Sequence, residues 1–152
     1  KFVSFTKLGG ILTTNIMEME LLYVLCGASV MLGHVYPIYH GFKGGKGAGT
    51  LAGVLLALVP IFPIPLIICF PIWIVTIIIS GYVGLSTIIS SIALPICTFI
   101  FYSKVIYSPI GGFSVMIPIF IIYNHRNNIS RMIEGNEFRF NKIMIFRKNK
   151  NS

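Results

Sequence analysis

Charge is what this sequence most clearly lacks. Only 11% of its 152 residues are charged, whereas 55% are hydrophobic and the mean hydropathy is +0.86. A soluble domain carries about 25% charged residues. Between Gly47 and Ser103 there is no Lys, Arg, Asp, Glu or His, and a membrane-spanning helix needs about 20 mostly apolar residues. The composition therefore excludes an ordinary soluble domain and a disordered chain, and it predicts a membrane protein.

Acidic residues are scarcer than basic ones, with four Asp and Glu against 12 Lys and Arg. Many of the basic residues follow the last apolar run: Arg126, Arg131, Arg139, Lys142, Arg147, Lys148 and Lys150. A basic chain can bind nucleic acid, but a basic flank beside membrane spans is typical of the cytoplasmic side. We therefore expect a multi-pass protein of the cell membrane with a cytoplasmic C-terminal tail. Its predicted partner is the lipid bilayer and not nucleic acid.

The sequence also lacks the motifs of covalent and metal chemistry. Cys26, Cys69 and Cys97 lie singly in apolar runs, without a CxxC pair or metal-ligand spacing. We expect them to be small buried hydrophobic residues. No GxSxG or HExxH motif is present, so a covalent nucleophile has little support. We expect no metal and no cofactor.

Apolar segments are what the chain does contain. They lie at residues 21–32, 51–62, 64–80, 85–102 and 105–123. Only helices and closed barrels satisfy every backbone polar group in a bilayer, and these lengths favour helices. The predicted fold is an all-α integral membrane protein, a polytopic helix bundle with about five hydrophobic segments. Because 51–62 is short and prolines follow, a re-entrant turn is the alternative there.

The predicted organisation is a single membrane domain over residues 1–152. Its parts are a segment that precedes the first apolar run (1–20), a polar loop (33–50), the membrane spans (51–123) and a basic cytoplasmic tail (124–152). Four apolar segments separate the polar loop from the tail. An even number of spans returns the chain to the side it left, so we expect the loop and the tail to meet at one membrane face.

Glycine and lysine are concentrated in the polar loop, as G41-F-K-G-G-K-G47. Successive backbone N–H groups in such a loop form an anion-binding concavity, and Lys43 and Lys46 add positive charge. A helix that begins near Gly47 directs its positive end at the same anion. The spacing differs from that of a Walker A loop. The loop predicts a phosphate site, and the alternative is a basic turn that contacts lipid headgroups.

A second polar cluster follows the last apolar segment, from Tyr123 to Glu137. On a helix, His125 and Asn128 are three residues apart and share a face, which Arg131 continues. Imidazole titrates near neutral pH and acts as a general base or an oriented donor. The alternative is an interfacial amphipathic segment whose charges face water.

These two clusters resemble two motifs of the bacterial membrane acyl-phosphate:glycerol-3-phosphate acyltransferases. G33-H-V-Y-P-I-Y-H-G-F-K-G-G-K-G-A-G-T50 is similar to the motif G-H-x-[FY]-P-x-x-x-x-F-K-G-G-K-G-x-x-T, and H125-R-N-N-I-S-R-M-I-E-G-N-E137 is similar to H-x-x-N-I-x-R-x-x-x-G-x-E. The resemblance implies an enzyme of about seven helices with a site open to the cytoplasm. It implies transfer of a fatty acyl group from acyl-phosphate to the 1-hydroxyl of glycerol 3-phosphate, in phospholipid biosynthesis, without metal or cofactor.

The resemblance also implies roles for individual residues. His125 and Asn128 would line the reacting centre, with His125 either a base or a phosphate ligand. Phosphate would be bound by Lys43, Gly44, Gly45, Lys46, Gly47 and Arg131. Glu137 would organise the second motif together with Arg131. For His34 and Thr87 a structural role and a functional role both remain open.

Two departures from the family motifs are visible. The family's first motif, which bears a functional Ser and Arg, is absent from these residues, so we expect a chain truncated at its start. The stretch G81-Y-V-G-L-S-T87 resembles R-Y-V-S-L-x-S, with Gly81 in place of Arg, Gly84 in place of a functional Ser and Thr87 in place of the second Ser. The alternatives are an inactive remnant of the enzyme and a small transporter, although a transporter would need ionisable residues within its spans.

Overall fold

The computed structural model describes residues 16–59, 63–102 and 107–140, and this part of the chain contains helices but no strands. The elements are α2 (Ile16–Val35), the 3₁₀ helix η1 (Ile38–His40), α3 (Ala48–Ala57), α4 (Pro63–Ser80), α5 (Val83–Phe101), α6 (Pro109–Asn124) and α7 (Arg126–Ile133). Most of the predicted 1–20 segment and the last part of the basic tail, residues 141–152, lie outside the described residues.

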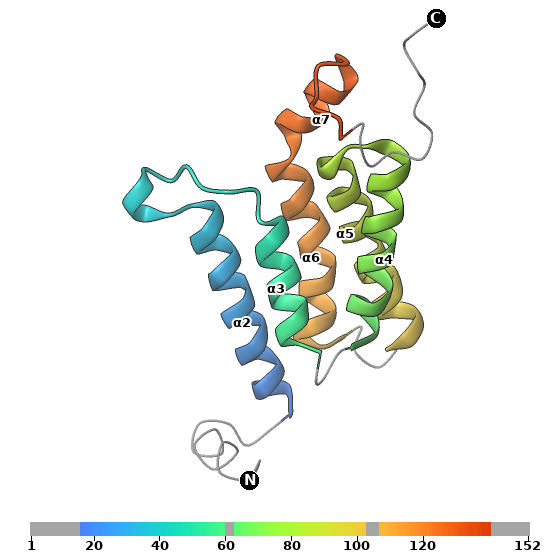
Figure 1. The fold of residues 1–152 in the computed structure, drawn as a ribbon. Helices are drawn as coiled ribbons and strands as arrows, with labels where there is room; N and C mark the ends of the chain where they lie inside the picture. Colours follow the sequence, from blue (N-terminus) through green and yellow to red (C-terminus); the bar gives the residue numbers. More distant parts are fainter. Residues whose placement is uncertain (1–15, 60–62, 103–106, 141–152) are drawn as a thin grey trace, which may run out of the picture.

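Five apolar helices lie side by side, and the short polar helix α7 continues beyond the end of α6 (Figure 1). Helix α5 packs against both α4 and α6, α2 packs against α6 and α3, and α3 packs against α4. The five helices correspond to the five predicted segments, with shifted bounds. The first helix begins at Ile16 and not at Leu21, so its first turns include the acidic residues Glu18 and Glu20.

Three stretches of the described residues are long and apolar enough to cross a membrane by length and composition: Glu18–His40, which begins in α2, and the helices α4 and α5. Helix α3 has only 10 residues, so at 1.5 Å per residue it rises about 15 Å. That is about half of the roughly 30 Å hydrocarbon core of a bilayer. From the sequence, this segment was expected to be either a full span or a re-entrant turn. In the structure it is a helix of half the length of a span, from Ala48 to Ala57.

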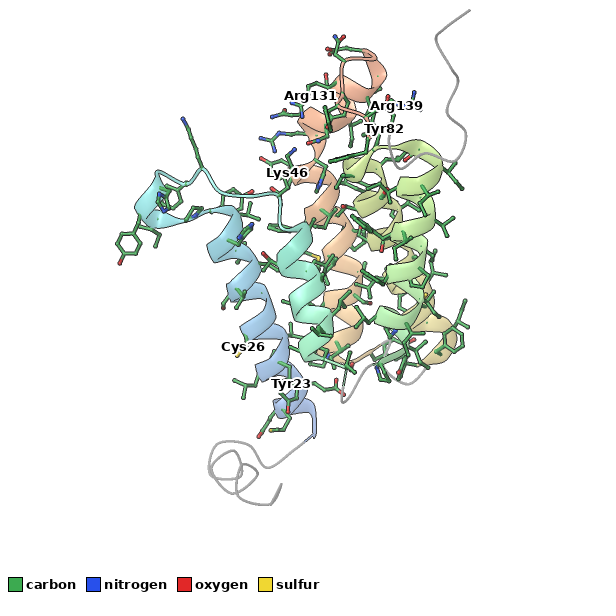
Figure 2. The ribbon with its side chains drawn as sticks, viewed as in Figure 1. Tyr23, Cys26, Lys46, Tyr82, Arg131 and Arg139 are labelled. Carbon is green, nitrogen blue, oxygen red and sulfur yellow. The ribbon has the colours of Figure 1, made fainter. Side chains whose placement is uncertain are left out.

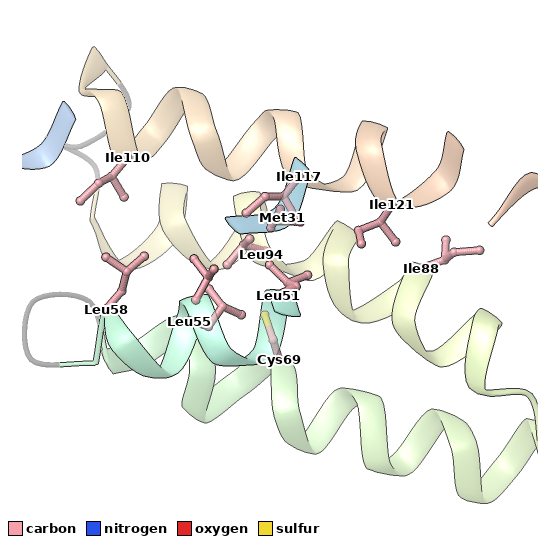
Figure 3. Close-up of a cluster of buried hydrophobic side chains, with 11 residues drawn as sticks. Met31, Leu51, Leu55, Leu58, Cys69, Ile88, Leu94, Ile110, Ile117 and Ile121 are labelled. Atoms are coloured by element: carbon pink, nitrogen blue, oxygen red, sulfur yellow. The ribbon is translucent and has the colours of Figure 1, made fainter. Parts of the chain in front are cut away.

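A single apolar cluster joins the five helices (Figure 3). Its members include Met31 from α2, Leu55 from α3, Cys69 from α4, Leu94 from α5 and Ile121 from α6, all less than 9% exposed. Many other large apolar side chains point outward, as they do where lipid rather than water surrounds a bundle. Cys69 and Cys97 are buried as predicted, whereas Cys26 is exposed on α2, which corrects that expectation.

Hydroxyl side chains line the buried face of α5 without breaking it. Ser86, Thr87, Ser91 and Thr98 are at most 4% exposed, and each hydroxyl donates to a carbonyl three or four residues earlier in the chain. Such bonds satisfy the hydroxyl within its own helix, and small side chains allow close helix packing in a membrane. Helix α5 therefore packs closely between α4 and α6, and its first residues, Val83 and Gly84, line the polar cavity described below.

Candidate active site

The glycine–lysine loop (residues 41–47) is anchored to the end of α2 by its own backbone. Gly44 N–H donates to the Val35 carbonyl (3.1 Å) and Gly45 N–H to the His34 carbonyl (3.2 Å). A Cβ atom at Gly44 would overlap both carbonyl oxygens, so this close approach requires glycine. The amides of Gly44 and Gly45 are thus used within the fold, and they close the loop rather than face a ligand.

The free amides of this region belong to the start of α3. Gly47 is the N-cap of the helix, no side chain caps it, and the first bond of the ladder runs from Leu51 N–H to the Gly47 carbonyl. The N–H groups of the first helical turn have no partner within a helix, and together they carry its positive partial charge. Lys46 stands directly before this end, so the start of α3 is suited to an anion.

His125 lies at the junction of α6 and α7 and is only 2% exposed. Its Nδ1 is 2.8 Å from the Ile121 carbonyl oxygen. Because a carbonyl only accepts, Nδ1 carries the hydrogen and Nε2 is the acceptor in the neutral ring. Burial lowers the pKa of His125, and the nearby Lys46 lowers it further, against opposing contributions from the Ile121 bond and Glu137. The imidazole is therefore neutral at pH 7 with Nε2 available.

Asn128 is 4% exposed and is oriented by Glu137. Its Nδ2 donates to Glu137 Oε1 (2.6 Å), and Arg131 Nε donates to Glu137 Oε2 (2.6 Å). Hydrogen bonding by Arg131 is the main reason that the pKa of Glu137 is lowered, so the carboxylate stays ionised. With the amide nitrogen held by a carboxylate, Asn128 Oδ1 is left as a buried acceptor without a partner among the described residues. We call His125, Asn128, Arg131 and Glu137 the α7 cluster.

The loop and the α7 cluster meet in one polar cavity of about 500 Å³. Eight residues singled out from the sequence line it: His34, Gly44, Gly45, Lys46, Gly47, His125, Asn128 and Glu137. Figure 2 shows Lys46 and Arg131 at the same end of the bundle. The prediction that the two polar regions meet at one face is confirmed, because α3 to α6 bring the chain back to the end at which it entered.

Three of the candidate residues do not line this cavity. Lys43 is exposed on the loop, and Arg131 acts through its ion pair with Glu137. Thr87 Oγ1 accepts a hydrogen bond from Trp73 Nε1 (3.2 Å) and donates to the Val83 carbonyl (2.9 Å), so it joins α4 to α5. For Thr87 the structural role is the one that these contacts favour.

Six further residues complete the cavity wall: Ala48, Gly49, Val83, Gly84, Phe138 and Phe140. Phe138 and Phe140 stack edge to face, and Phe140 N–H donates to the Gly81 carbonyl (2.9 Å). Arg139 donates from Nε to the Ser80 carbonyl and lies over the Tyr82 ring. The segment 134–140 is thereby fastened across the α4–α5 turn. The distribution of charge in the sequence did not predict that these residues line the cavity. Gly84 does lie in the stretch 81–87, which resembles a family motif.

An apolar pocket of about 270 Å³ adjoins this cavity and shares Ala48 and Gly49 with it. Its other walls come from α3, α4 and α5, including Leu55, Cys69 and Trp73. The α3 helix thus has a polar cavity at its first turn and an apolar pocket along its side.

Comparison with known proteins decides the family. A family model described as glycerol-3-phosphate acyltransferase matches residues 4–135. The chain belongs to this family. Its similar relatives include a glycerol-3-phosphate acyltransferase of Desulforamulus reducens, 39% identical over 111 residues, which cover 73% of this chain and 52% of the relative. Glycerol-3-phosphate acyltransferase 2 of Bacillus anthracis is 37% identical over 121 residues, covering 80% of this chain and 58% of the relative.

Two solved structures of this family share the fold. They are crystal structures of PlsY (YgiH), an integral membrane glycerol 3-phosphate acyltransferase, in a lysophosphatidic acid form and a glycerol 3-phosphate form. The TM-scores are 0.67 and 0.64 at 34% and 35% identity, and each match covers 77% of this chain. The match covers 57% and 56% of those chains, so this chain spans little more than half the length of the relatives that it matches. The predicted class, an all-α polytopic membrane protein, is confirmed.

The departures from the family motif at residues 81–87 have a structural context. Gly81 has φ +73°, a backbone conformation that an arginine rarely adopts. A Cβ at Gly84 would lie 3.3 Å from Asn128 Cβ and Nδ2, so Asn128 would have to shift by a few tenths of an ångström. In this chain, glycine at position 84 therefore leaves Asn128 tightly packed against bare backbone.

Proposed function

We propose that this chain forms part of an enzyme that transfers a fatty acyl group from acyl-phosphate to the 1-hydroxyl of glycerol 3-phosphate. The products would be 1-acyl-glycerol 3-phosphate and inorganic phosphate, an early step of phospholipid biosynthesis. The observation that carries the proposal is the shared cavity, where the positive end of α3 and Lys46 face a neutral, buried His125 and the oriented Asn128.

Both substrates carry phosphate, and the cavity suits an anion on the loop side. The unpaired amides of the first turn of α3 and the Lys46 ammonium add positive charge there. Only one carboxylate, that of Glu137, lines the described part of the cavity, and Arg131 is paired with it. The family resemblance also implies phosphate binding by Lys43, Gly44, Gly45, Gly47 and Arg131. In this chain we propose an indirect part for Gly44 and Gly45, whose amides bond to the end of α2 and shape the loop, and for Arg131, which would act through Glu137.

The α7 side of the cavity suits the transfer step. The 1-hydroxyl of the acceptor attacks the acyl carbonyl, the bond from the acyl carbon to the phosphate oxygen breaks, and the hydroxyl proton leaves. His125 Nε2 is the acceptor that we assign to this proton, because the Ile121 bond holds the hydrogen on Nδ1. Asn128 Oδ1, left without a partner, would accept from the acceptor's other hydroxyl and so orient the molecule, because the single hydrogen of the 1-hydroxyl goes to His125. Acyl-phosphate has a good leaving group, so positioning and charge neutralisation would supply much of the barrier reduction.

The surroundings fit substrates of opposite polarity. The apolar pocket along α3 adjoins the polar cavity, so a fatty chain has an apolar wall while its phosphate stays at the start of α3. A site at one end of the bundle also lies at the membrane boundary, where a lipid-soluble donor and a water-soluble acceptor meet. We propose the cell membrane as the location, with the cavity facing the cytoplasm.

A second candidate is a remnant that binds phosphate without turnover. It is favoured by one observation, the bare backbone at Gly84, where the family motif has a functional Ser. A transporter is not favoured, because α3, α4 and α5 contain no ionisable residue except cysteine.

The deciding experiment measures transfer of labelled acyl groups to glycerol 3-phosphate by membranes that contain the whole chain. Acyl-phosphate and acyl-CoA are compared as donors, and binding of labelled glycerol 3-phosphate is measured in the same membranes. Transfer from acyl-phosphate supports the enzyme. Transfer from acyl-CoA alone contradicts it, and binding without transfer from either donor identifies the remnant.

A further inference from the structure

The segment of residues 36–43, which we call the projecting turn, exposes apolar side chains at its tip. Ile38 is 73% exposed, Tyr39 97% and Phe42 62%. It follows α2 directly and includes η1. None of these three side chains lines the polar cavity, so the proposed function leaves them without a role.

The projecting turn has a defined backbone. His40 N–H and Phe42 N–H both donate to the Pro37 carbonyl, at 3.2 and 3.0 Å, and Lys43 N–H donates to the His40 carbonyl at 3.3 Å. Phe42 has φ +60°, which is rare for a bulky residue. At the base of the turn, the Tyr36 hydroxyl donates to Asn124 Oδ1 on α6 (3.3 Å). The turn therefore holds Phe42 outward, in a left-handed backbone conformation that the hydrogen bonds of the turn fix.

The direction of the turn matters as much as its exposure. In Figure 1 the turn leaves the end of α2 sideways, away from the other helices and across their common direction. The candidate membrane span that begins in α2 runs from Glu18 to His40, so the first part of the turn is the last part of this span. When α2 crosses a bilayer, a segment that leaves its end sideways is directed at the surrounding leaflet.

The charge around the turn has one sign. Lys43 belongs to it, Lys46 follows, and the sequence contains no Asp or Glu between Leu21 and Ile133. Aromatic side chains with an apolar body and a polar tip concentrate at membrane interfaces. Basic residues at that level are attracted by the anionic headgroups of the cytoplasmic leaflet.

We propose that the projecting turn is an interfacial anchor that occupies the headgroup region of the surrounding leaflet. Ile38, Tyr39 and Phe42 enter the boundary between headgroups and acyl chains, and Lys43 contacts anionic headgroups. This inference needs the chain to be in a membrane but does not rest on the proposed reaction.

The test uses Tyr39→Trp in a Trp73→Phe background, which removes the single native tryptophan. The full chain is reconstituted in vesicles of a zwitterionic and an anionic phospholipid, and bromine is placed near the carbonyl end of the chains of one lipid at a time. We expect the tryptophan introduced in the turn to lose most of its emission to brominated lipid, more when the anionic lipid carries the bromine. We also expect it to be shielded from aqueous iodide.

The matched control is Ile133→Trp in the same background. Ile133 is 83% exposed at the end of α7, which continues beyond the bundle, so a tryptophan there should be quenched by iodide and little by lipid. Quenching of the turn tryptophan by iodide alone would place the turn in water and overturn the proposal. Quenching by neither agent would mean that protein covers the turn, which also overturns it. Stronger quenching by brominated zwitterionic lipid would contradict the contact between Lys43 and anionic headgroups.

Discussion

The two walls of the polar cavity are built by different means. The glycine–lysine loop is held by backbone hydrogen bonds from Gly44 and Gly45 to the end of α2, and its lysines remain exposed. The α7 cluster is held by side chains, with His125 and Asn128 buried and the Glu137 carboxylate shared by Asn128 and Arg131. The first wall carries exposed lysine side chains that can move toward an anion. The second holds the neutral side chains of His125 and Asn128 in fixed directions.

If the proposed function holds, this difference separates binding from chemistry. Changes in the loop should act mainly on the KM for glycerol 3-phosphate, because they alter charge and shape around phosphate. Changes in the α7 cluster should act mainly on kcat, because they alter groups placed for proton transfer. Four substitutions, ordered from the largest expected effect to the smallest, test that separation.

His125→Ala should lower kcat by about 10²- to 10⁴-fold, the usual contribution of a general base, with a smaller change in KM. In the unaltered chain, kcat should rise with pH through the pKa of His125, whose midpoint lies below the ordinary 6.5 because burial disfavours the imidazolium. Initial rates of acyl transfer across pH measure both effects. Arg126→Ala, at an exposed neighbouring position, is the control and should keep kcat. An unchanged pH profile in His125→Ala would remove the base assignment.

Gly44→Ala should disrupt the loop, because its Cβ has no room beside the carbonyls of His34 and Val35. We expect a rise in KM of at least tenfold, together with a lower unfolding temperature in detergent. Gly33→Ala is the matched control, since a Cβ there has no heavy atom within 4 Å. Equal effects of the two substitutions would show that the close approach at Gly44 does not shape the site.

Lys46→Ala should raise KM by about tenfold to a hundredfold, as a hydrogen bond to a charged group contributes about 1.5–3 kcal/mol. Lys43→Ala should raise it less, because Lys43 does not line the cavity. Steady-state kinetics at low and high salt measure both, and the effect of Lys46 should shrink with salt. If kcat fell and KM stayed constant in Lys46→Ala, the division between a binding wall and a chemical wall would be wrong.

Glu137→Gln should have the smallest effect, because the amide oxygen still accepts from Asn128 Nδ2. Arg131 is 46% exposed, so loss of the ion pair should cost at most about 1 kcal/mol of stability. Because the folded pKa of Glu137 is lowered, its contribution is present above the unfolded pKa and lost as pH falls through the folded value. The unfolding temperatures of the unaltered chain and of Glu137→Gln should therefore differ at neutral pH and become equal in acid. Glu137→Ala, which cannot orient Asn128, should lower kcat more than Glu137→Gln, and equal kcat values would exclude the orienting role.

Much of this architecture was predictable from the sequence because membrane spans are encoded by composition. The long uncharged stretch around α4 and α5 leaves few alternatives to helices, and the glycine–lysine pattern marked the loop. The bounds were less predictable, because a continuous apolar pattern does not show where α3 ends. Exposure was also harder to predict, since Cys26 lies in an apolar run like Cys69 and yet faces outward.

The sequence alone was enough for the class of fold and the two polar regions, because apolar and polar runs are local properties of the chain. Their meeting at one end followed from the four apolar segments that lie between them. Only the tertiary structure decided how each polar atom is used. Gly44 and Gly45 donate to α2, Asn128 presents Oδ1 because Glu137 holds its nitrogen, and Thr87 is engaged by Trp73. These hydrogen bonds join residues that are distant in sequence. In a weakly polar environment a polar atom bonds to the partner that packing places beside it, so the tertiary structure is needed to identify that partner.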